Sequence, residues 1–349
     1  MRIVSVSGAE PALRTWQERC PGRPDIRPGQ AVGPGARSAA STSVDGEGKG
    51  DCHDSTTEAL ELWAQRGQEG PLAPHPLQAR AGQRHSAVPA IRPGSRARTP
   101  GLFADPIAAD PKYIVRLALE GGFNGIAIQI GLAEKFYWDY AGEVPLILKL
   151  NGKTDIPADT RALSPLHASV EDAVRLGADA VGYTLYVGSP AQDADFAQYR
   201  VVRQDAQRLG MPLIVWAYPR GEAIEHKGGK DSFYAVHYAA RTASELGADV
   251  VKVNFPHPEK HTDVPAPYEA DFSSQEAIGA VVRAANRTLV LVSGGSRAGD
   301  DVMIEKAQES MSAGATGLIF GRNVWQRDHD ESLRFVDRLR EILAKYPTP

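Results

Sequence analysis

One lysine lies inside an apolar run that has the length of a β-strand. The run is GADVVKVNF, residues 247 to 255, and the lysine is Lys252. Buried strands of a parallel sheet are near-continuous runs of Val, Ile and Leu, and a lysine there loses its hydration unless something uses it. An ordinary lysine has a pKa of about 10.4, and burial lowers this pKa, which frees the amine to attack a ketone and form a Schiff base. Lys252 is therefore a catalytic candidate, against the alternatives of an ion pair or an outward-pointing side chain.

Two aromatic residues end the preceding apolar run, LIVWAYP. They are Trp216 and Tyr218, which alternate onto the same face of a strand. A tyrosine hydroxyl beside an imine can pass protons between carbon and solvent. Tyr218 is therefore a candidate for proton transfer, whereas Trp216 is expected mainly to fill space beside it.

Two later runs end in residues that suit a phosphate group. LVLVSGGS ends with Ser293, Gly294 and Gly295, and LIFGRN ends with Gly321 and Arg322. Closely spaced backbone N–H groups and a bidentate guanidinium both bind phosphate well. If the two runs are adjacent strands, they predict one phosphate site between them.

A second anionic group has candidates in the run ILKLNGKT. Lys149, Asn151 and Lys153 follow one another at its end, and Lys149 lies deepest in the run. A solvated loop lysine is an equal alternative for Lys153.

Metal chemistry has less support. None of the apolar runs carries the histidines that a zinc-dependent enzyme needs. His257 and His261 are four residues apart in HPEKH, but a proline between them indicates a loop. We expect no metal and no other cofactor.

Seven short apolar runs follow residue 101, most of them separated by helical patterns. DPKYIVRLALEGG predicts the first of these helices, with Asp110 as N-cap and Pro111 at the first helical position. The runs are NGIAIQIG, VPLILKLNG, ADAVGYTLYVG, MPLIVWAYP, ADVVKVNF, RTLVLVSGG and ATGLIFGRN.

Helix-capping residues recur at the boundaries between helices and strands. A glycine precedes four of the runs, at Gly177, Gly210, Gly247 and Gly314, as a helix C-cap. Capping boxes are predicted at Ser169 to Asp172 and at Ser273 to Glu276. Alternating strands and helices predict a parallel sheet, either doubly wound or closed as a (β/α)8 TIM barrel, and residues 101 to 349 have the typical barrel length. A barrel needs one more strand before Asp110.

Charge and composition exclude several classes of partner. The 349 residues include 39 basic and 43 acidic side chains, with no polybasic run, so we expect no nucleic acid and no membrane partner. The two cysteines, Cys20 and Cys52, are too few for a disulfide framework. No apolar run approaches a membrane span, and we expect a cytoplasmic protein.

Residues 1 to 100 differ from the rest of the chain. They contain no Phe and no Tyr, 12 Arg against one Lys, 11 Pro and 12 Gly. Such a segment buries too little apolar surface to offset its ordering entropy. We predict a boundary at residue 100, between a disordered or out-of-frame segment and a barrel domain over residues 101 to 349.

The barrel domain resembles the archaeal-type class I fructose-bisphosphate aldolases, which also occur in bacteria. The likeness spans about residues 101 to 345 and includes the seven runs in order, with SGGS and GRNVWQR. It implies a (β/α)8 barrel, Lys252 as the Schiff-base lysine, Tyr218 as the proton-transfer residue with Trp216 beside it, and a substrate phosphate at the two glycine-containing ends. It further implies a homo-oligomer that cleaves fructose 1,6-bisphosphate in glycolysis and gluconeogenesis. Related Schiff-base synthases and thiolases share the lysine, so they remain an alternative, as does a barrel that only binds sugar phosphate.

The departure from this family lies at the first strand. The family pattern ends that strand in Asp-Gln-Gly followed by Glu-His, and its aspartate assists at the imine. No such motif precedes Asp110, although one choice of codons for residues 89 to 98 encodes Leu-Pro-Ser-Asp-Gln-Gly-Arg-Glu-His in the next frame. HSAVPAIRP is the stretch that could fill the gap, with Pro89 unable to donate to a ladder. We therefore expect the first strand to be missing or replaced, and activity to be low.

Overall fold

The computed structural model describes residues 110–154, 156–259, 261, 263–294 and 299–346, together with the backbone of residues 88–89. Apart from the backbone of Val88 and Pro89, the predicted segment 1 to 100 lies outside the described residues, Cys20 and Cys52 included. The strands are β1 Val88–Pro89, β2 Ile126–Gln129, β3 Leu146–Lys149, β4 Ala180–Val187, β5 Leu213–Pro219, β6 Val250–Asn254, β7 Leu289–Ser293 and β8 Gly317–Phe320.

Helices connect successive strands from β2 onward. The α-helices are α4 Pro111–Glu120, α5 Ile130–Leu132, α6 Val170–Arg175, α7 Gln192–Leu209, α8 Glu222–Glu225, α9 Phe233–Glu245, α10 Ser274–Ala285, α11 Asp300–Ser312, α12 Arg322–Trp325 and α13 His329–Leu343. Short helical turns of other types are η2 Ala133–Tyr137, η3 Trp138–Tyr140, η4 Asp159–Arg161 and η5 Ala266–Tyr268. None of the helices in the described ranges is both long and apolar enough to cross a membrane.

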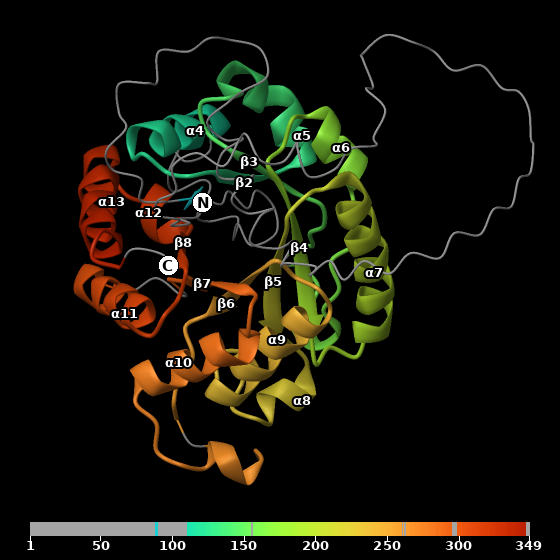
Figure 1. The fold of residues 1–349 in the computed structure, drawn as a ribbon, viewed down its shortest axis with the longest axis vertical. Helices are drawn as coiled ribbons and strands as arrows, with labels where there is room; N and C mark the ends of the chain where they lie inside the picture. Colours follow the sequence, from blue (N-terminus) through green and yellow to red (C-terminus); the bar gives the residue numbers. More distant parts are fainter. Residues whose placement is uncertain are drawn as a thin grey trace, which may run out of the picture. The chain divides into compact units, whose positions relative to one another are not determined.

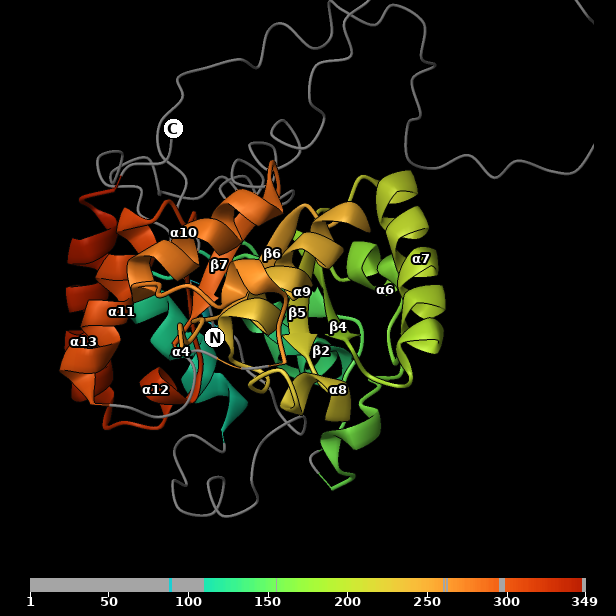
Figure 2. The ribbon, with the colours of Figure 1, turned by 90° about the horizontal axis from the view of Figure 1, so that it is seen from below.

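All neighbouring strands are parallel, and the sheet curls in the order β1-β8-β7-β6-β5-β4-β3-β2 (Figure 1). The longer helices lie around the outside of the curl, as Figures 1 and 2 show. The seven predicted strands are confirmed, and so is the α/β barrel-type fold. Parallel strands with helices between them need helical cover on the sheet face that points away from the curl, which explains the ring of helices.

The first strand is short and comes from the predicted stretch HSAVPAIRP. Its two residues pair with β8, Val88 with Ile319 and Pro89 with Phe320. Pro89 has no N–H group to donate to the ladder. Among the described residues no backbone ladder joins β1 to β2, so hydrogen bonds do not close the barrel there.

The predicted helix boundaries are confirmed. Asp110 caps α4 by accepting a bond from the Lys112 N–H, with a proline in the first turn. Both predicted capping boxes are formed, at the starts of α6 and α10. The four glycines predicted to end helices have φ between 66° and 92°, a range that favours glycine, and they let the chain turn directly into the next strand.

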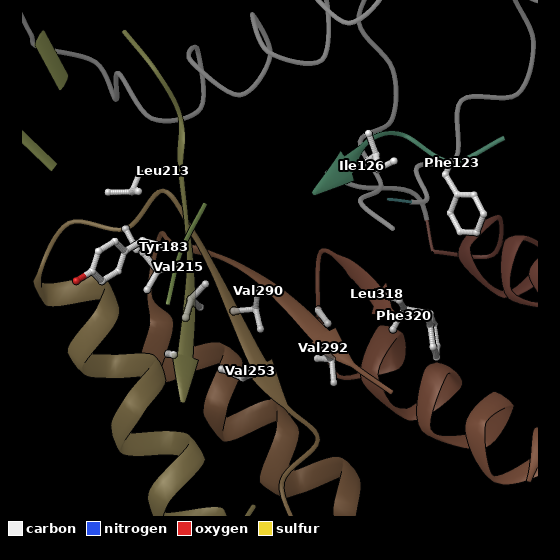
Figure 3. Close-up of a cluster of buried hydrophobic side chains, with 14 of the residues drawn as sticks. Phe123, Ile126, Tyr183, Leu213, Val215, Val253, Val290, Val292, Leu318 and Phe320 are labelled. Atoms are coloured by element: carbon white, nitrogen blue, oxygen red, sulfur yellow. The ribbon is translucent and has the colours of Figure 1, made fainter. Parts of the chain in front are cut away.

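Two apolar clusters lie on the two faces of the curled sheet. The larger one joins the sheet to the helices and contains Val215, Val253, Val290 and Leu318 (Figure 3). The smaller one lines the inside of the curl, and its strand residues alternate with those of the larger one. Its buried members are Ala127, Ile147, Ala162, Ala180, Tyr186, Ile214, Trp216, Tyr218, Val250, Leu291 and Ile319.

Candidate active site

Lys252 lies on the inner face of β6. Its neighbours Val251 and Val253 belong to the outer cluster, whereas Val250 belongs to the inner one. Because side chains alternate along a strand, Lys252 and Asn254 share the inner face with Val250. The lysine side chain is only 1% exposed, so the outward-pointing alternative is wrong.

Two neutral oxygens surround the amine of Lys252. Its Nζ donates to the Tyr218 hydroxyl at 2.8 Å and to Asn254 Oδ1 at 2.9 Å. The Nζ also lies 4.3 Å from the centroid of the Tyr218 ring. Sequence reasoning paired Lys252 with Tyr218, and the structure brings the two side chains together. The hydroxyl is within the distance at which a proton passes to or from the nitrogen.

A hydrogen-bond chain continues from the lysine to a carboxylate that sequence reasoning missed. Asn254 Nδ2 donates to Asp231 Oδ1 at 2.5 Å, and the Ser293 hydroxyl donates to Asn254 Oδ1 at 3.1 Å. Burial acts to raise the pKa of Asp231, but the ion pair with Lys230 and the bond from Asn254 outweigh burial and hold this pKa below its usual range. Asp231 is therefore ionised at neutral pH, two hydrogen bonds away from Lys252.

Trp216 fills space inside the curl, as its position in the sequence predicts. It pairs in register with Lys252 and is buried. A side chain at Gly182 would meet the Trp216 ring at 3.0 Å and Lys149 Cδ at 3.1 Å. The absence of a side chain at Gly182 therefore lets the indole and Lys149 pack over β4.

Lys149, the predicted second anion site, is buried at the end of β3. Its Nζ donates to Asn151 Oδ1 at 2.7 Å and, at longer range, to the backbone oxygens of Asn151 and Gly182. It lies 4.9 Å from the Trp216 ring centroid. These contacts give the ammonium neutral partners within the fold, and its role toward a substrate anion stays a prediction.

A second cationic group lies next to Tyr218, and sequence reasoning gave it no role. Arg220 is buried, its guanidinium lies 5.2 Å from the Tyr218 ring centroid, and its Nε donates to Asp159 at 2.9 Å. Lys153 pairs with the same carboxylate at 2.7 Å. Asp159 thus holds two cations, one from the loop after β3 and one from the end of β5.

Four of the predicted phosphate-binding residues, Ser293, Gly294, Gly321 and Arg322, lie at the ends of β7 and β8, which are adjacent and parallel. A side chain at Gly294 would overlap Met303 Cε and would lie 2.7 Å from Phe320 Cε1, so one of these side chains would have to shift to admit it. Gly321 precedes α12, whose first residue is the exposed Arg322. Gly295 lies outside the described residues.

Most of the described part of this chain matches a known protein family. The sequence model of the DeoC/LacD family aldolases matches residues 90–327. The chain belongs to this family. Lys252, Tyr218 and the ends of β7 and β8 all lie within the matched range of this aldolase.

Relatives of this aldolase carry more specific names. It is 40% identical to the class 1 fructose-bisphosphate aldolase of Thermoproteus tenax over 246 residues, which are 70% of this chain and 84% of that protein. It is 34% identical to the enzyme of the same name from Halobacterium salinarum over 240 residues, 69% of this chain and 83% of that protein. Both relatives are class I enzymes, which agrees with the resemblance found in the sequence.

A solved structure supports the fold of this aldolase. An archaeal fructose-1,6-bisphosphate aldolase, with its catalytic lysine covalently bound to the carbinolamine intermediate of the substrate, matches with a TM-score of 0.65. The two chains are 33% identical, and the match covers 83% of this chain and 99% of that one. The described fold is therefore that of a Schiff-base aldolase.

The loop histidines of this aldolase do not form a metal cluster. In the ranges that the structure describes, no group of three or more His, Cys, Asp or Glu side chains could hold a metal ion. His257 is exposed, and its backbone N–H donates to the Asp231 carbonyl at 2.7 Å. His261 packs against Gly228. The backbone of His257 therefore holds the loop of Asp231 in place.

Proposed function

We propose that this chain is a class I fructose-bisphosphate aldolase that acts through a Schiff base on Lys252. The observation that carries the proposal is the buried amine of Lys252 on the inner face of β6, 2.8 Å from the Tyr218 hydroxyl. The reaction is the reversible cleavage of fructose 1,6-bisphosphate to dihydroxyacetone phosphate and glyceraldehyde 3-phosphate. The names of the relatives support this substrate, because the alignments to them cover most of the length of both chains.

Lys252 supplies the nucleophile. Its neutral amine attacks the ketone carbon of the open-chain sugar, and loss of water from the carbinolamine gives a protonated imine. The imine draws the electron pair of the neighbouring carbon–carbon bond when that bond breaks. Hydrolysis of the imine then returns the free amine and releases dihydroxyacetone phosphate.

Tyr218 moves the proton in the cleavage step. A base must take the proton of the sugar hydroxyl that becomes the aldehyde, and an acid must return a proton to the enamine carbon. The Tyr218 hydroxyl lies next to the nitrogen that becomes the imine. It is therefore placed to serve both steps, while Trp216 holds the neighbouring wall of the site.

The ends of β7 and β8 bind one substrate phosphate. Ser293, Gly294 and Gly321 offer backbone groups at adjacent strand ends, and Arg322 adds a guanidinium. We extend this proposal to Gly295, which follows Gly294 directly in the sequence. Lys149 is the proposed source of positive charge for a second anionic group.

The first strand limits the rate that we expect. No carboxylate follows Val88–Pro89 in the sequence before residue 105, whereas the family pattern has an aspartate there. We therefore expect imine formation with a lower turnover than the family pattern implies. A related synthase or thiolase, or a barrel that only binds sugar phosphate, would differ in the products that it forms.

The test is an assay of fructose 1,6-bisphosphate cleavage with the purified full chain and with Lys252→Met. The proposal expects triose phosphates from the first protein and none from the second. Fructose 1-phosphate and unphosphorylated fructose serve as comparison substrates. Equal activity of both proteins would refute the role of Lys252, and absence of cleavage with retained sugar-phosphate binding would favour the binding-only alternative.

Two further proposals concern the whole molecule. We propose a homo-oligomer that acts on a phosphorylated sugar in the cytoplasm. Light scattering of the purified chain measures the oligomeric state, and a single-chain mass at micromolar concentration would contradict it.

A further inference from the structure

We propose that Asp231 is a positioning residue for Lys252 and that it acts through the side-chain amide of Asn254. The inference rests on the proposed function, because it assigns a partner to the same Schiff-base lysine. Neither Asp231 nor Asn254 bears a role in the reaction as described above. They are joined to Lys252 by two consecutive hydrogen bonds, of 2.5 Å and 2.9 Å.

The chemistry of the partners permits one orientation of the Asn254 amide. An ionised aspartate only accepts hydrogen bonds, so the group that faces it must be a donor. The amide NH2 must therefore face Asp231, which leaves the amide oxygen toward Lys252 Nζ and the Ser293 hydroxyl. Without the carboxylate the amide would be free to turn its NH2 group toward the amine, where it would donate to the lone pair that must attack the ketone.

The fixed oxygen has a consequence for the nucleophile. A neutral amine has two N–H bonds and one lone pair. Lys252 Nζ donates to Tyr218 Oη and to Asn254 Oδ1. These two bonds stop the amine from rotating about the Cε–Nζ bond, so its lone pair is held in one tetrahedral direction. Holding a nucleophile in one direction raises the rate of its attack, because the entropy of orienting it has already been lost when the protein folds.

The backbone holds Asp231 in place independently of its side chain. Ser232 forms a parallel bridge with His257, just after β6. The His257 N–H donates to the Asp231 carbonyl at 2.7 Å, and the Phe233 N–H donates to the His257 carbonyl at 2.9 Å. These bonds tie the loop before α9 to the end of the strand that carries Lys252, so substitutions of the Asp231 side chain are expected to preserve the fold.

The experiment is a double-mutant cycle with Asp231→Ala, Asn254→Ala and the two combined. For each full-length protein we measure the rate at which borohydride traps the adduct with dihydroxyacetone phosphate, and the kcat and KM for fructose 1,6-bisphosphate. Asp231→Ala is expected to slow trapping and kcat by about tenfold, the worth of one hydrogen bond, with KM within about twofold. Because Asp231 acts through Asn254, the double variant is expected to match Asn254→Ala alone.

Two further variants separate positioning from stability. Asp231→Asn keeps an acceptor oxygen for Asn254 Nδ2 and is expected to restore most of the trapping rate. Asp249→Ala is the matched control, because Asp249, like Asp231, is a half-buried carboxylate. It precedes the same strand and accepts from the Leu213 N–H at 2.8 Å, at the opposite end of β6. It is expected to lower the melting temperature without changing the trapping rate.

Three results would overturn the inference. The first is an unchanged trapping rate in Asp231→Ala. The second is a trapping rate in the double variant that falls by the product of the two single losses. The third is an Asp231→Asn protein that traps as slowly as Asp231→Ala. Each is read against the unsubstituted chain. If that chain forms no adduct with dihydroxyacetone phosphate, the proposed function fails; if it does and Asp231→Ala forms the adduct equally fast, only the inference about Asp231 fails.

Discussion

Replacing Tyr218 with phenylalanine separates its proton chemistry from its packing. The side chain is 6% exposed, and its hydroxyl accepts from Lys252 Nζ at 2.8 Å. Tyr218→Phe removes this hydroxyl and leaves the ring in the inner cluster. General acid–base catalysis contributes about 10²- to 10⁴-fold, so we expect kcat to fall at least about 100-fold, or about 2.7 kcal/mol in the barrier. The free energy of unfolding should change by only about 1 kcal/mol, the worth of one buried hydrogen bond.

The neighbouring Tyr186 offers a matched control. It pairs in register with Tyr218 on β4, belongs to the same inner cluster, and its hydroxyl accepts from Ser164 Oγ at 3.3 Å. Tyr186→Phe should cost similar stability and leave kcat within about threefold. The assays are steady-state cleavage, borohydride trapping and chemical unfolding. Trapping should remain detectable in Tyr218→Phe. Equal losses of kcat in both variants, or a parallel loss of trapping and turnover in Tyr218→Phe, would show that the ring only packs.

Three further predictions concern the phosphate site and a buried carboxylate. Arg322→Ala should raise the KM for phosphorylated substrate by about tenfold or more with little change in kcat, because it removes charge-assisted hydrogen bonds; a normal KM would remove Arg322 from the site. Gly294→Ala places a methyl group 2.7 Å from Phe320. It should lower the free energy of unfolding by about 1–3 kcal/mol, which chemical unfolding measures. An unchanged free energy of unfolding would mean that the side chains around Gly294 move aside. Burial raises the pKa of Asp195 to about 6, above its value in the unfolded chain of about 3.9. The unfolded chain therefore loses this proton first, so stability falls as pH rises from about 4 to about 6, by about 3 kcal/mol. The side chain in Asp195→Asn does not titrate. The difference in free energy of unfolding between this variant and the unsubstituted chain should therefore shift by about 3 kcal/mol in favour of the variant between about pH 4 and about pH 6. Equal dependence of the free energy of unfolding on pH in the two proteins would contradict the prediction.

The strands and helix ends could be predicted because their signals are local. A run such as ADVVKVNF has strand length and apolar character, and the period-two alternation of its residues places Lys252 and Asn254 on one face. The same alternation could have identified Asn254 as a neighbour of the lysine. Capping residues such as Ser169 and Ser273 act within one turn of their own helix, so the sequence alone contains both partners.

The contacts made by loops could not be predicted in the same way. Asp231 reaches the site because a backbone bridge between Ser232 and His257 joins two loops, and nothing in the residue types at these positions indicates that pairing. Asp159 likewise reaches Arg220 from 61 residues away in the sequence. The position of β1 depends on the open edge of β8, which accepts a two-residue strand although Pro89 lacks a donor. Long-range contacts of this kind follow from the assembled sheet.

The most direct test of the central claim is to locate the covalent adduct. The full chain is incubated with dihydroxyacetone phosphate and borohydride in the presence of EDTA, digested, and analysed by peptide mass spectrometry. We expect one reduced adduct on the peptide that contains Lys252, and none in Lys252→Met. An adduct on Lys149 or another lysine, or trapping that survives Lys252→Met, would contradict it.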